Sequence, residues 1–392
     1  MYGKSILIEE INKLTSHELT NYIREKKINM VGEPVAEKSD ETKINWEKET
    51  DFEFKFRIGM VSEFKLEKFS KSMKFNKYDI KIDKKIINET IKNLQNQFPV
   101  FVDIKEVKND SIVEGKIINS KEYQKQNLKL FLKSLNQNEI KKILKKKIGN
   151  KVDLSLYKLC DSNIHQLNQM FQTNLKSINE FEDKIGFQID KISTQKPSDI
   201  NNELFEKVFG KGNIKNKTEF ENKIKESIKS NYDRESEMLL NRSIQKQITN
   251  KHSISIPDEF LKNWIQKNND KKSSDEIINK NYKNYCQELK WTFIVDKIVE
   301  KESIKVENNE IEETAKNQIR YQLASSGIQN PEKELDKFVK SYLGQKNGDN
   351  YFKIQNQLKS DKAMSAIKKR ISISNKNITF DKFKSLSIKE LK

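Results

Sequence analysis

The sequence has 392 residues, of which 34% are hydrophobic and 34% are charged, and its formal net charge is +17. A chain of this length with so few apolar residues predicts two to four domains with much exposed surface and argues against one compact core. No stretch approaches the roughly 20 apolar residues that a membrane span needs. The cysteines, Cys160 and Cys286, form no CxxC pattern, and the histidines are scattered. This usage argues against a disulfide framework and a metal site, and it fits a reducing, cytoplasmic setting.

The first residues, MYGKSILIEEINKL, have the spacing of an amphipathic helix. The apolar face of this helix is made of Ile6, Ile8, Ile11 and Leu14. The pattern predicts a helix over residues 1–26, broken near residues 15–18, and a turn at Gly32-Glu33-Pro34. The apolar run that begins at Ile6 ends at Glu9, so it is too short for an export signal.

Two alternating stretches predict half-buried strands. In FEFKFRIG the aromatic residues Phe52, Phe54 and Phe56 alternate with charged residues, and KYDIKI at residues 77–82 repeats the alternation. Residues 83–97 then have helical periodicity, which predicts a helix that ends before a proline.

Residues 101–194 differ from the chain on either side of them. Short β-like runs recur there, namely VFVDI, SIVEGKI, LKLFL, KVDLSLY and GFQIDKI. Helical stretches at residues 138–147 and around 161–175 lie between these runs. We therefore expect a small α+β insert.

From residue 200 to about residue 370, helical periodicity dominates. Two pairs, Thr218 with Glu221 and Ser273 with Glu276, have the spacing of capping boxes that open helices. The last part, ISISNKNITFDKF, is expected to be extended. The predicted fold class is α+β, multidomain, mainly helical and elongated, without a solenoid repeat.

Motifs that carry catalysis are missing from the sequence. It contains no GxGxxG, no GxxxxGK[ST], no GxSxG and no HExxH. We therefore assign no catalytic residue, no metal ligand and no cofactor. What the chain offers instead is helices with aromatic stripes, which either form a core or remain exposed as an interaction surface.

The basic charge raises the possibility of nucleic-acid binding. Only six of the 75 basic residues are arginine, however, and bidentate recognition of bases and phosphates favours arginine. Residues 121–150 hold nine lysines against two glutamates, a net charge of +7. The candidate basic patch is Lys141, Lys142, Lys145, Lys146 and Lys147. The alternative is an ordinary solvated lysine face.

Several stretches, taken in order, resemble trigger factor, the ribosome-associated bacterial chaperone, in its Bacteroidetes-like form. They are MYGKSILIEEINK, GEPVAE at 32–37, FEFKFRIGMVSEF at 52–64, NNELFEKVFGKG at 201–212 with TEFENKIKESI after it, ISIPDEFLKNWI at 254–265 and ITFDKF at 378–383. Together they span nearly the whole chain, although no single stretch is decisive.

The resemblance implies four parts. These are a partial ribosome-binding domain at residues 1–76, a linker arm of a strand and a helix at 77–100, a degenerate FKBP-like prolyl-isomerase domain at 101–194, and a helical, two-armed chaperone domain at 195–392. In the family, a Gly-Phe-Arg docking motif precedes the segment that matches MYGKS. We expect the sequence to begin after that motif, either as an N-terminally truncated form or as a form that has lost the docking loop, so no ribosome-docking residue is assigned.

The insert departs from the family's isomerase pattern. An isomerase of this class needs a dry aromatic pocket that twists the Xaa–Pro bond. Residues 101–194 contain no Trp and no Pro, and their tyrosines are Tyr123 and Tyr157. We expect the fold to be retained and the pocket to be lost.

The resemblance and the missing catalytic motifs together predict an ATP-independent chaperone for nascent or unfolded polypeptides. The predicted client-facing aromatic residues of the C-terminal arm are Phe338, Tyr342, Tyr351 and Phe352. Their alternative role is packing between the arm helices. The resemblance also implies the ribosome, near its exit tunnel, as a partner, and a homodimer is left open. Two other functions remain as alternatives: an active prolyl isomerase through the insert, and a basic RNA- or ribosome-binding protein.

Overall fold

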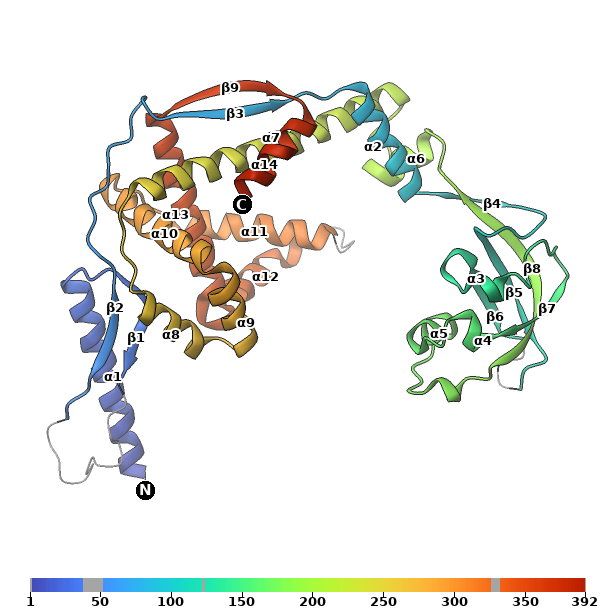
Figure 1. Ribbon diagram of the computed structural model, residues 1–392, viewed down its shortest axis with the longest axis horizontal. Coiled ribbons are helices and arrows are strands. Elements are labelled where there is room, and N and C mark those ends of the chain that lie inside the picture. Colours follow the sequence, from blue (N-terminus) through green and yellow to red (C-terminus); the bar gives the residue numbers. More distant parts are fainter. Residues whose placement is uncertain (1, 38–51, 122, 124, 326–331, 392) are drawn as a thin grey trace. The chain divides into compact units, whose positions relative to one another are not determined.

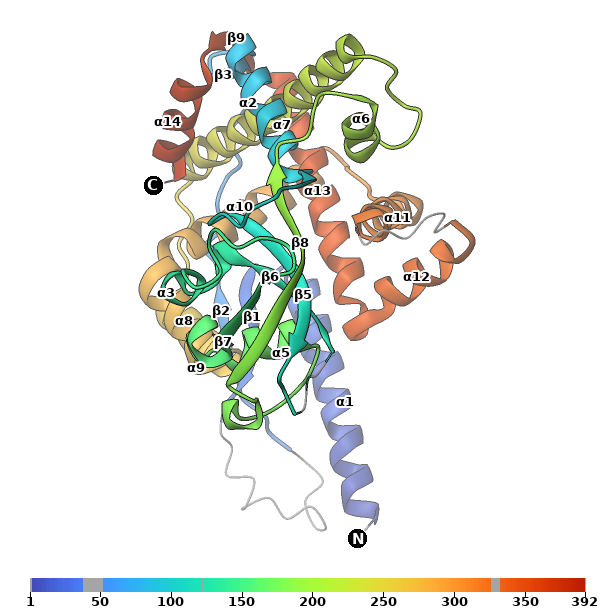
Figure 2. The same cartoon turned by 90° about the vertical axis from the view of Figure 1, so that its right-hand side faces the viewer.

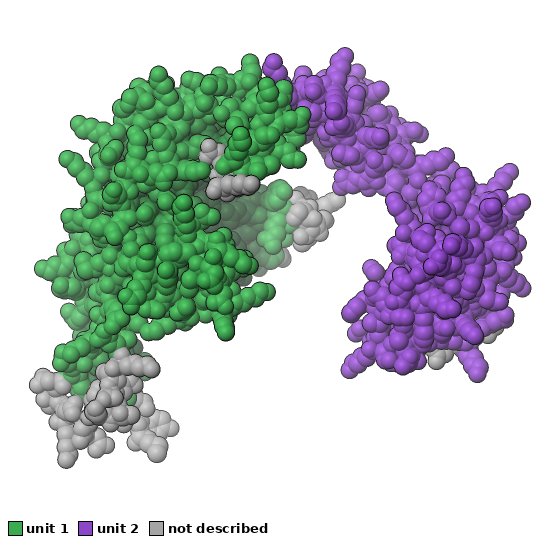
Figure 3. Space-filling model, in the orientation of Figure 1, with its two compact units in different colours: residues 1–80, 232–392 green, residues 81–231 purple. Residues whose placement is uncertain are grey.

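The computed structural model describes residues 2–37, 52–121, 123, 125–325 and 332–391. The chain divides into two compact units, shown in Figure 3. The body unit contains residues 1–80 and 232–392, and the insert unit contains residues 81–231. The division falls within the long helix α7, Lys217–Lys251. The prediction of a multidomain, mainly helical α+β protein is confirmed (Figure 1).

The body unit begins with helix α1, Tyr2–Glu25. The predicted break near residues 15–18 is wrong, because the helix is continuous. Thr15 and Thr20 donate their hydroxyl groups to the carbonyl oxygens of Ile11 and Ser16, each at 2.7 Å. These local bonds satisfy the polar side chains inside the helix, so they need not end it.

Strands β1, Met30–Ala36, and β2, Phe56–Met60, form an antiparallel pair. The turn predicted at Gly32-Glu33-Pro34 is instead a bulge within β1, where the register shifts between Val31 and Val35. The alternation predicted for residues 52–57 is present, with half-buried phenylalanines between exposed charged residues. Regular strand pairing, however, begins only at Phe56.

Strand β3, Lys74–Ile80, pairs in parallel with β9, Ser372–Ile378, and so ties the early chain to its end. The extended end predicted for the chain is wrong beyond Ile378, because helix α14, Phe380–Leu391, follows. Phe383 on this helix is buried, and its ring lies edge-on to that of Tyr78 at 6.2 Å. The helix therefore packs an apolar face against β3.

Helices form the rest of the body unit. They are α8, Asp258–Asn268; α9, Lys271–Glu276; the π-helical segment η4, Ile277–Asn281; α10, Tyr282–Lys301; α11, Asn308–Ser325; α12, Glu332–Gly344; the 3-10 segment η5, Gln345–Gly348; and α13, Asp349–Arg370. Their largest core joins α7, α8, α10 and α13 to β1 and to the segment around Phe64. Within the described ranges, every helix falls short of the length and apolarity needed to cross a membrane.

Both predicted capping boxes lie at the wrong residues. Helix α7 begins before Thr218, and the side chain of Asn216 accepts the N–H of Glu219 at 2.9 Å. Helix α9 begins at Lys271, and Asp270 accepts the N–H of Ser273 at 3.0 Å. In both cases an Asn or Asp side chain, which is a strong N-cap, caps the helix two or three residues before the predicted position.

The insert unit combines helices with a sheet. Helix α2, Lys84–Gln97, is capped by Asp83, and α6, Asn202–Phe209, packs against α7 through Phe205 and Phe220, whose ring centroids are 4.6 Å apart. In the described chain the sheet has the order β4-β8-β5-β6, with β7 also paired to β8. Its strands are β4, Val100–Asp103; β5, Ser111–Ile118; β6, Asn127–Phe131; β7, Lys151–Ser155; and β8, Lys184–Lys196.

Short helices cover this sheet. They are η2, Leu132–Ser134; α3, Gln137–Ile140; α4, Leu156–Leu159; α5, Ile164–Phe171; and η3, Ile178–Glu180. The helix predicted for residues 138–147 is therefore much shorter than expected. Lys145 has a φ of +60°, and its N–H donates to the carbonyl of Val107. This left-handed residue turns the chain back to the sheet.

Candidate functional site

Helices α11, α12 and α13 pack on one another and form the C-terminal arm (Figure 2). The apolar core of the arm consists of Ile311, Ala315, Ile319, Leu335, Val339 and Ile354. The core residues of α11 and of α12 repeat at helical spacing, and Ile354 on α13 packs against them, so the three helices close their own core. The arm therefore has a folded scaffold on which other side chains are displayed.

Ion pairs hold the arm helices together at their surface. Arg320 on α11 donates from Nε and Nη2 to the two carboxylate oxygens of Glu332 on α12, at 2.8 and 3.2 Å. These bonds hold the pKa of the Glu332 carboxyl below its usual range. Lys316 also pairs with Asp336, at 3.2 Å. Such two-point bonds fix the geometry more than they add free energy, because the groups are exposed.

Large aromatic rings protrude from this scaffold. Phe338 on α12 is 44% exposed, Phe352 on α13 is 56% exposed, and Tyr321 on α11 is 80% exposed. Three lysines within two residues of Phe338 or Phe352 are also exposed, namely Lys337, Lys340 and Lys353. We call Tyr321, Phe338 and Phe352 the arm surface.

The other two aromatic residues predicted for this role, Tyr342 and Tyr351, are half-buried and pack against the arm core. The hydroxyl of Tyr351 donates to Asn308 at 2.6 Å, and that of Tyr342 lies 3.5 Å from Gln318. Their polar ends therefore have partners within the arm. Tyr321 was not predicted from the sequence, although it lies two positions after the buried Ile319 and so points away from the core stripe.

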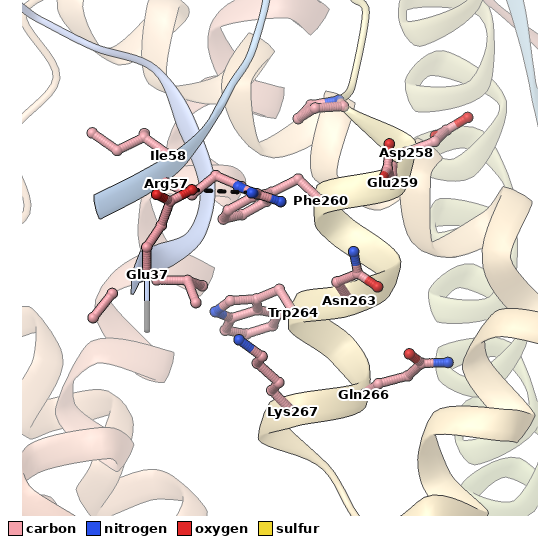
Figure 4. Close-up of a pocket in the computed structure, with 13 residues that line it drawn as sticks. Glu37, Arg57, Ile58, Asp258, Glu259, Phe260, Asn263, Trp264, Gln266 and Lys267 are labelled. Carbon is pink, nitrogen blue, oxygen red and sulfur yellow. Dashed lines mark hydrogen bonds and ion pairs between the residues drawn. The ribbon is translucent and has the colours of Figure 1, made fainter. Parts of the chain in front are cut away.

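A groove of about 900 Å³ lies between the β1–β2 pair and helix α8 (Figure 4). Its apolar wall includes Val35, Ile58, Phe260 and Trp264, and its rim carries an ion pair between Arg57 and Glu37 at 3.0 Å. Among the described residues, the buried Nε1–H of Trp264 has no hydrogen-bond partner. No sequence pattern indicates this groove, because it joins residues far apart in the chain.

The candidate basic patch belongs to the insert unit, whereas the arm belongs to the body unit. Its five lysines are exposed and lie in the turn and loop that follow α3, where Lys141 is the C-cap residue. Lys142 pairs with the buried Glu139 at 2.5 Å. Burial acts most strongly on Glu139 and raises the pKa of its carboxyl, but the bonds from Lys142 and from the Ser155 N–H outweigh it and leave the pKa lowered. One lysine of the patch thus has a structural role.

The aromatic rings of the insert pack on one another. Tyr123 lies 4.7 Å from Phe171 and 6.4 Å from Phe181, measured between ring centroids, and both phenylalanines are buried. A cavity of about 580 Å³ on this unit is lined by polar side chains such as Asn136, Glu139 and Lys158. In the part of the chain that the structure describes, no three potential metal ligands lie together.

Helices that close their own core while large aromatic rings remain exposed are typical of a protein with an apolar interaction surface. Comparison with family models identifies which protein of this class it is. Residues 1–94 match the model described as "Bacterial trigger factor protein (TF)", and residues 236–387 match the model described as "Probable trigger factor, C-terminal domain". The chain belongs to the trigger factor family, and it is a chaperone.

A solved structure described as "Promiscuous Substrate Recognition in Folding and Assembly Activities of the Trigger Factor Chaperone" is 14% identical to this chain, with a TM-score of 0.46. The match covers 93% of this chain and 86% of that one. No curated protein matches the chain.

Proposed function

We propose that this chaperone holds unfolded or nascent polypeptides on the arm surface. The observation that supports this most directly is the exposure of Tyr321, Phe338 and Phe352 on helices whose own core is complete without them. Exposed rings of this size are available to the apolar side chains of a client. The lysines near these rings add positive charge that favours acidic stretches of a client.

The expected binding is weak and spread over several contacts. Burying one large apolar side chain contributes roughly 1.5–3 kcal/mol, and ordering the client offsets part of this gain. Three such contacts suit a holding function, because the client remains bound briefly and is then released without ATP.

The family implies the ribosome as a further partner, and we propose residues 1–76 as the domain concerned. On the same basis, residues 77–100 are a linker arm, residues 101–194 are the FKBP-like domain, and residues 195–392 are the chaperone domain. Whether the protein forms a homodimer can be measured by sedimentation velocity.

Photo-crosslinking tests the client contact. A benzophenone amino acid is placed singly at position 338, 352 or 22, and each full-length variant is mixed with a reduced, carboxymethylated protein that cannot fold. Tyr22 on α1 is 53% exposed and is the matched control. We expect crosslinks from positions 338 and 352 at several times the yield from position 22. Equal yields from all three positions would contradict the proposal.

A further inference from the structure

Strand β4 of the insert unit has a free edge. In the described chain its strand neighbour is β8, with Val102 opposite Thr194. Just beyond β4, the N–H of Ile104 donates to the carbonyl of Ile192 on β8 at 2.9 Å. Alternate residues of a strand direct their N–H and C=O groups to the same side. The main-chain N–H and C=O groups of Val102 therefore point to β8, whereas those of Phe101 and Asp103 point to the free edge.

Both faces of β4 carry exposed apolar side chains. Phe101 is 58% exposed and Val102, on the opposite face, is 37% exposed. Natural edge strands are protected from pairing by Pro, charged side chains, a bulge or a very short length. Strand β4, VFVD, is short and carries one charge, Asp103, but it contains neither Pro nor Lys, and its register with β8 is regular. This edge is thus open to another strand.

An apolar patch begins at this edge with Phe101 and crosses the outer face of the sheet to Phe131 on β6. Phe131 on β6 is 47% exposed, and the Lys129 ammonium lies 5.9 Å from the centre of the Phe101 ring and 5.7 Å from that of Phe131. Ile112, opposite Phe131 in the register, is buried although it is not part of the insert's core cluster. The edge patch, defined as Phe101, Ile112, Lys129 and Phe131, therefore has its own small apolar centre.

The charges on this face are paired. Three lysine–carboxylate pairs lie on it: Lys129 with Glu114 at 2.8 Å, Lys191 with Asp103 at 3.3 Å, and Lys116 with Asp190 at 3.8 Å. A balanced face gives a polyanion such as RNA no electrostatic advantage. Unpaired main-chain groups next to apolar rings fit an extended polypeptide instead.

We propose that an extended, apolar segment of an unfolded polypeptide pairs with the free edge of β4 and places a side chain on the edge patch. Strand addition of this kind takes its affinity from main-chain hydrogen bonds and its preference from alternate side chains. The inference rests on the proposed chaperone function, and it gives the insert unit a client contact of its own.

The test compares two variants of the full-length chain, Asp103→Pro and Asp103→Ala. Both lose the exposed ion pair with Lys191, but only proline removes the outward N–H, and it leaves the bonds to β8 in place because an edge strand tolerates proline on its free side. The probe is a fluorescein-labelled ten-residue peptide with alternating Val and Ser, read by fluorescence anisotropy. Its partner probe carries N-methyl groups on alternate residues, which block one hydrogen-bonding edge without changing the side chains.

We expect Asp103→Ala to bind the peptide within about twofold of the wild type, since an exposed ion pair contributes little. Asp103→Pro and Phe101→Ser are expected to weaken binding at least fivefold, and the N-methylated peptide to lose a similar factor with the wild type. Equal affinities of Asp103→Pro and Asp103→Ala would overturn the proposal. Binding of oligouridylate in place of the peptide would also overturn it. So would a wild-type dimer that does not bind the peptide and that Asp103→Pro dissociates.

The arm surface gives an independent readout. If arm variants lose aggregation suppression while Asp103→Pro binds the peptide normally, the strand-addition inference fails and the proposed function stands. If Asp103→Pro loses the peptide while arm variants remain fully active, the arm assignment fails and the edge contact stands.

Discussion

The indole ring of Trp264 lies directly over Gly32, so closely that a Cβ on the glycine would be 2.7 Å from the ring. The next strand has the same arrangement, because a Cβ on Gly59 would be 2.2 Å from the ring of Phe260. Two glycines thus let helix α8 pack against the backbone of the β1–β2 pair and form one wall of the groove in Figure 4. Gly32 also has a φ of +65°, which disfavours other residues.

Replacing Gly32 by alanine is expected to lower the free energy of unfolding of the body unit by about 2–4 kcal/mol, because it combines a left-handed backbone with overpacking. Urea unfolding followed by tryptophan fluorescence measures the change. Gly348→Ala is the matched control, since Gly348 has a φ of +89° but its Cβ would meet only Phe352 at 3.7 Å. The control is expected to lose only about 1–2 kcal/mol. Equal losses would show that Trp264 is not in close contact with Gly32.

Glu237 on α7 is expected to make a pH-dependent contribution to the free energy of unfolding. Its carboxylate accepts hydrogen bonds from Lys368 on α13 and from Lys77 on β3. Burial raises the pKa of its carboxyl, but the two ammonium groups outweigh burial and leave the pKa lowered. A lowered folded-state pKa stabilises the fold above the unfolded-state pKa of about 4.3 and loses this effect as the pH falls through the folded-state value.

We therefore expect Glu237→Gln to lower the free energy of unfolding by about 1 kcal/mol at pH 7, and by progressively less below about pH 4.3, the unfolded-state value. Urea unfolding at a series of pH values checks this. Glu9→Gln, which removes an exposed pair with Lys13 on α1, is the control and should have little effect at any pH. A Glu237→Gln effect that stays constant down to pH 2.5 would contradict the account.

Cys160 is buried in the insert, and burial raises the pKa of its thiol to about 11. In a Cys286→Ser variant it is the remaining thiol, and we expect it not to react with a thiol reagent at pH 8 until the protein unfolds. The rate at which the thiol reacts should then rise with the denaturant concentration. Rapid reaction of the native protein would place Cys160 near solvent.

The insert is expected not to catalyse prolyl isomerisation. Its rings at Tyr123, Phe171 and Phe181 pack on one another, so they are not arranged around an apolar cavity that could desolvate an Xaa–Pro bond. The measurement is the proline-limited refolding of an unfolded test protein with the full-length chain present. A dose-dependent acceleration of the slow phase would overturn this expectation.

Periodicity was enough to predict most of the helical body and the strands of the insert. Ile224 and Ile228, for example, are buried one turn apart on α7, as their spacing indicates. The pairing of β3 with β9 could not be predicted, because both strands are short and come from distant parts of the sequence. The same holds for the groove, which depends on small residues of β1 and β2 facing large ones of α8.

The candidate site was predictable only in part. Phe338 and Phe352 lie outside the core stripes of their helices and are exposed, whereas Tyr342 and Tyr351 were equally aromatic in the sequence and proved half-buried. What separates the two pairs is the position of each residue relative to the neighbouring helices. The position of each residue relative to the neighbouring helices depends on how the helices pack, which cannot be read from a single sequence.

Aggregation suppression tests the central claim, that exposed rings of the arm hold clients. The variant Tyr321→Ser/Phe338→Ser/Phe352→Ser is compared with the wild type and with Tyr22→Ser/Met238→Ser, which changes residues of similar exposure outside the arm. Light scattering of a heat-unfolded client, with matched circular dichroism of the variants, is the measurement. The account predicts that the arm variant loses most of its suppression while the control keeps it. An arm variant that suppresses aggregation as well as the wild type would contradict the account.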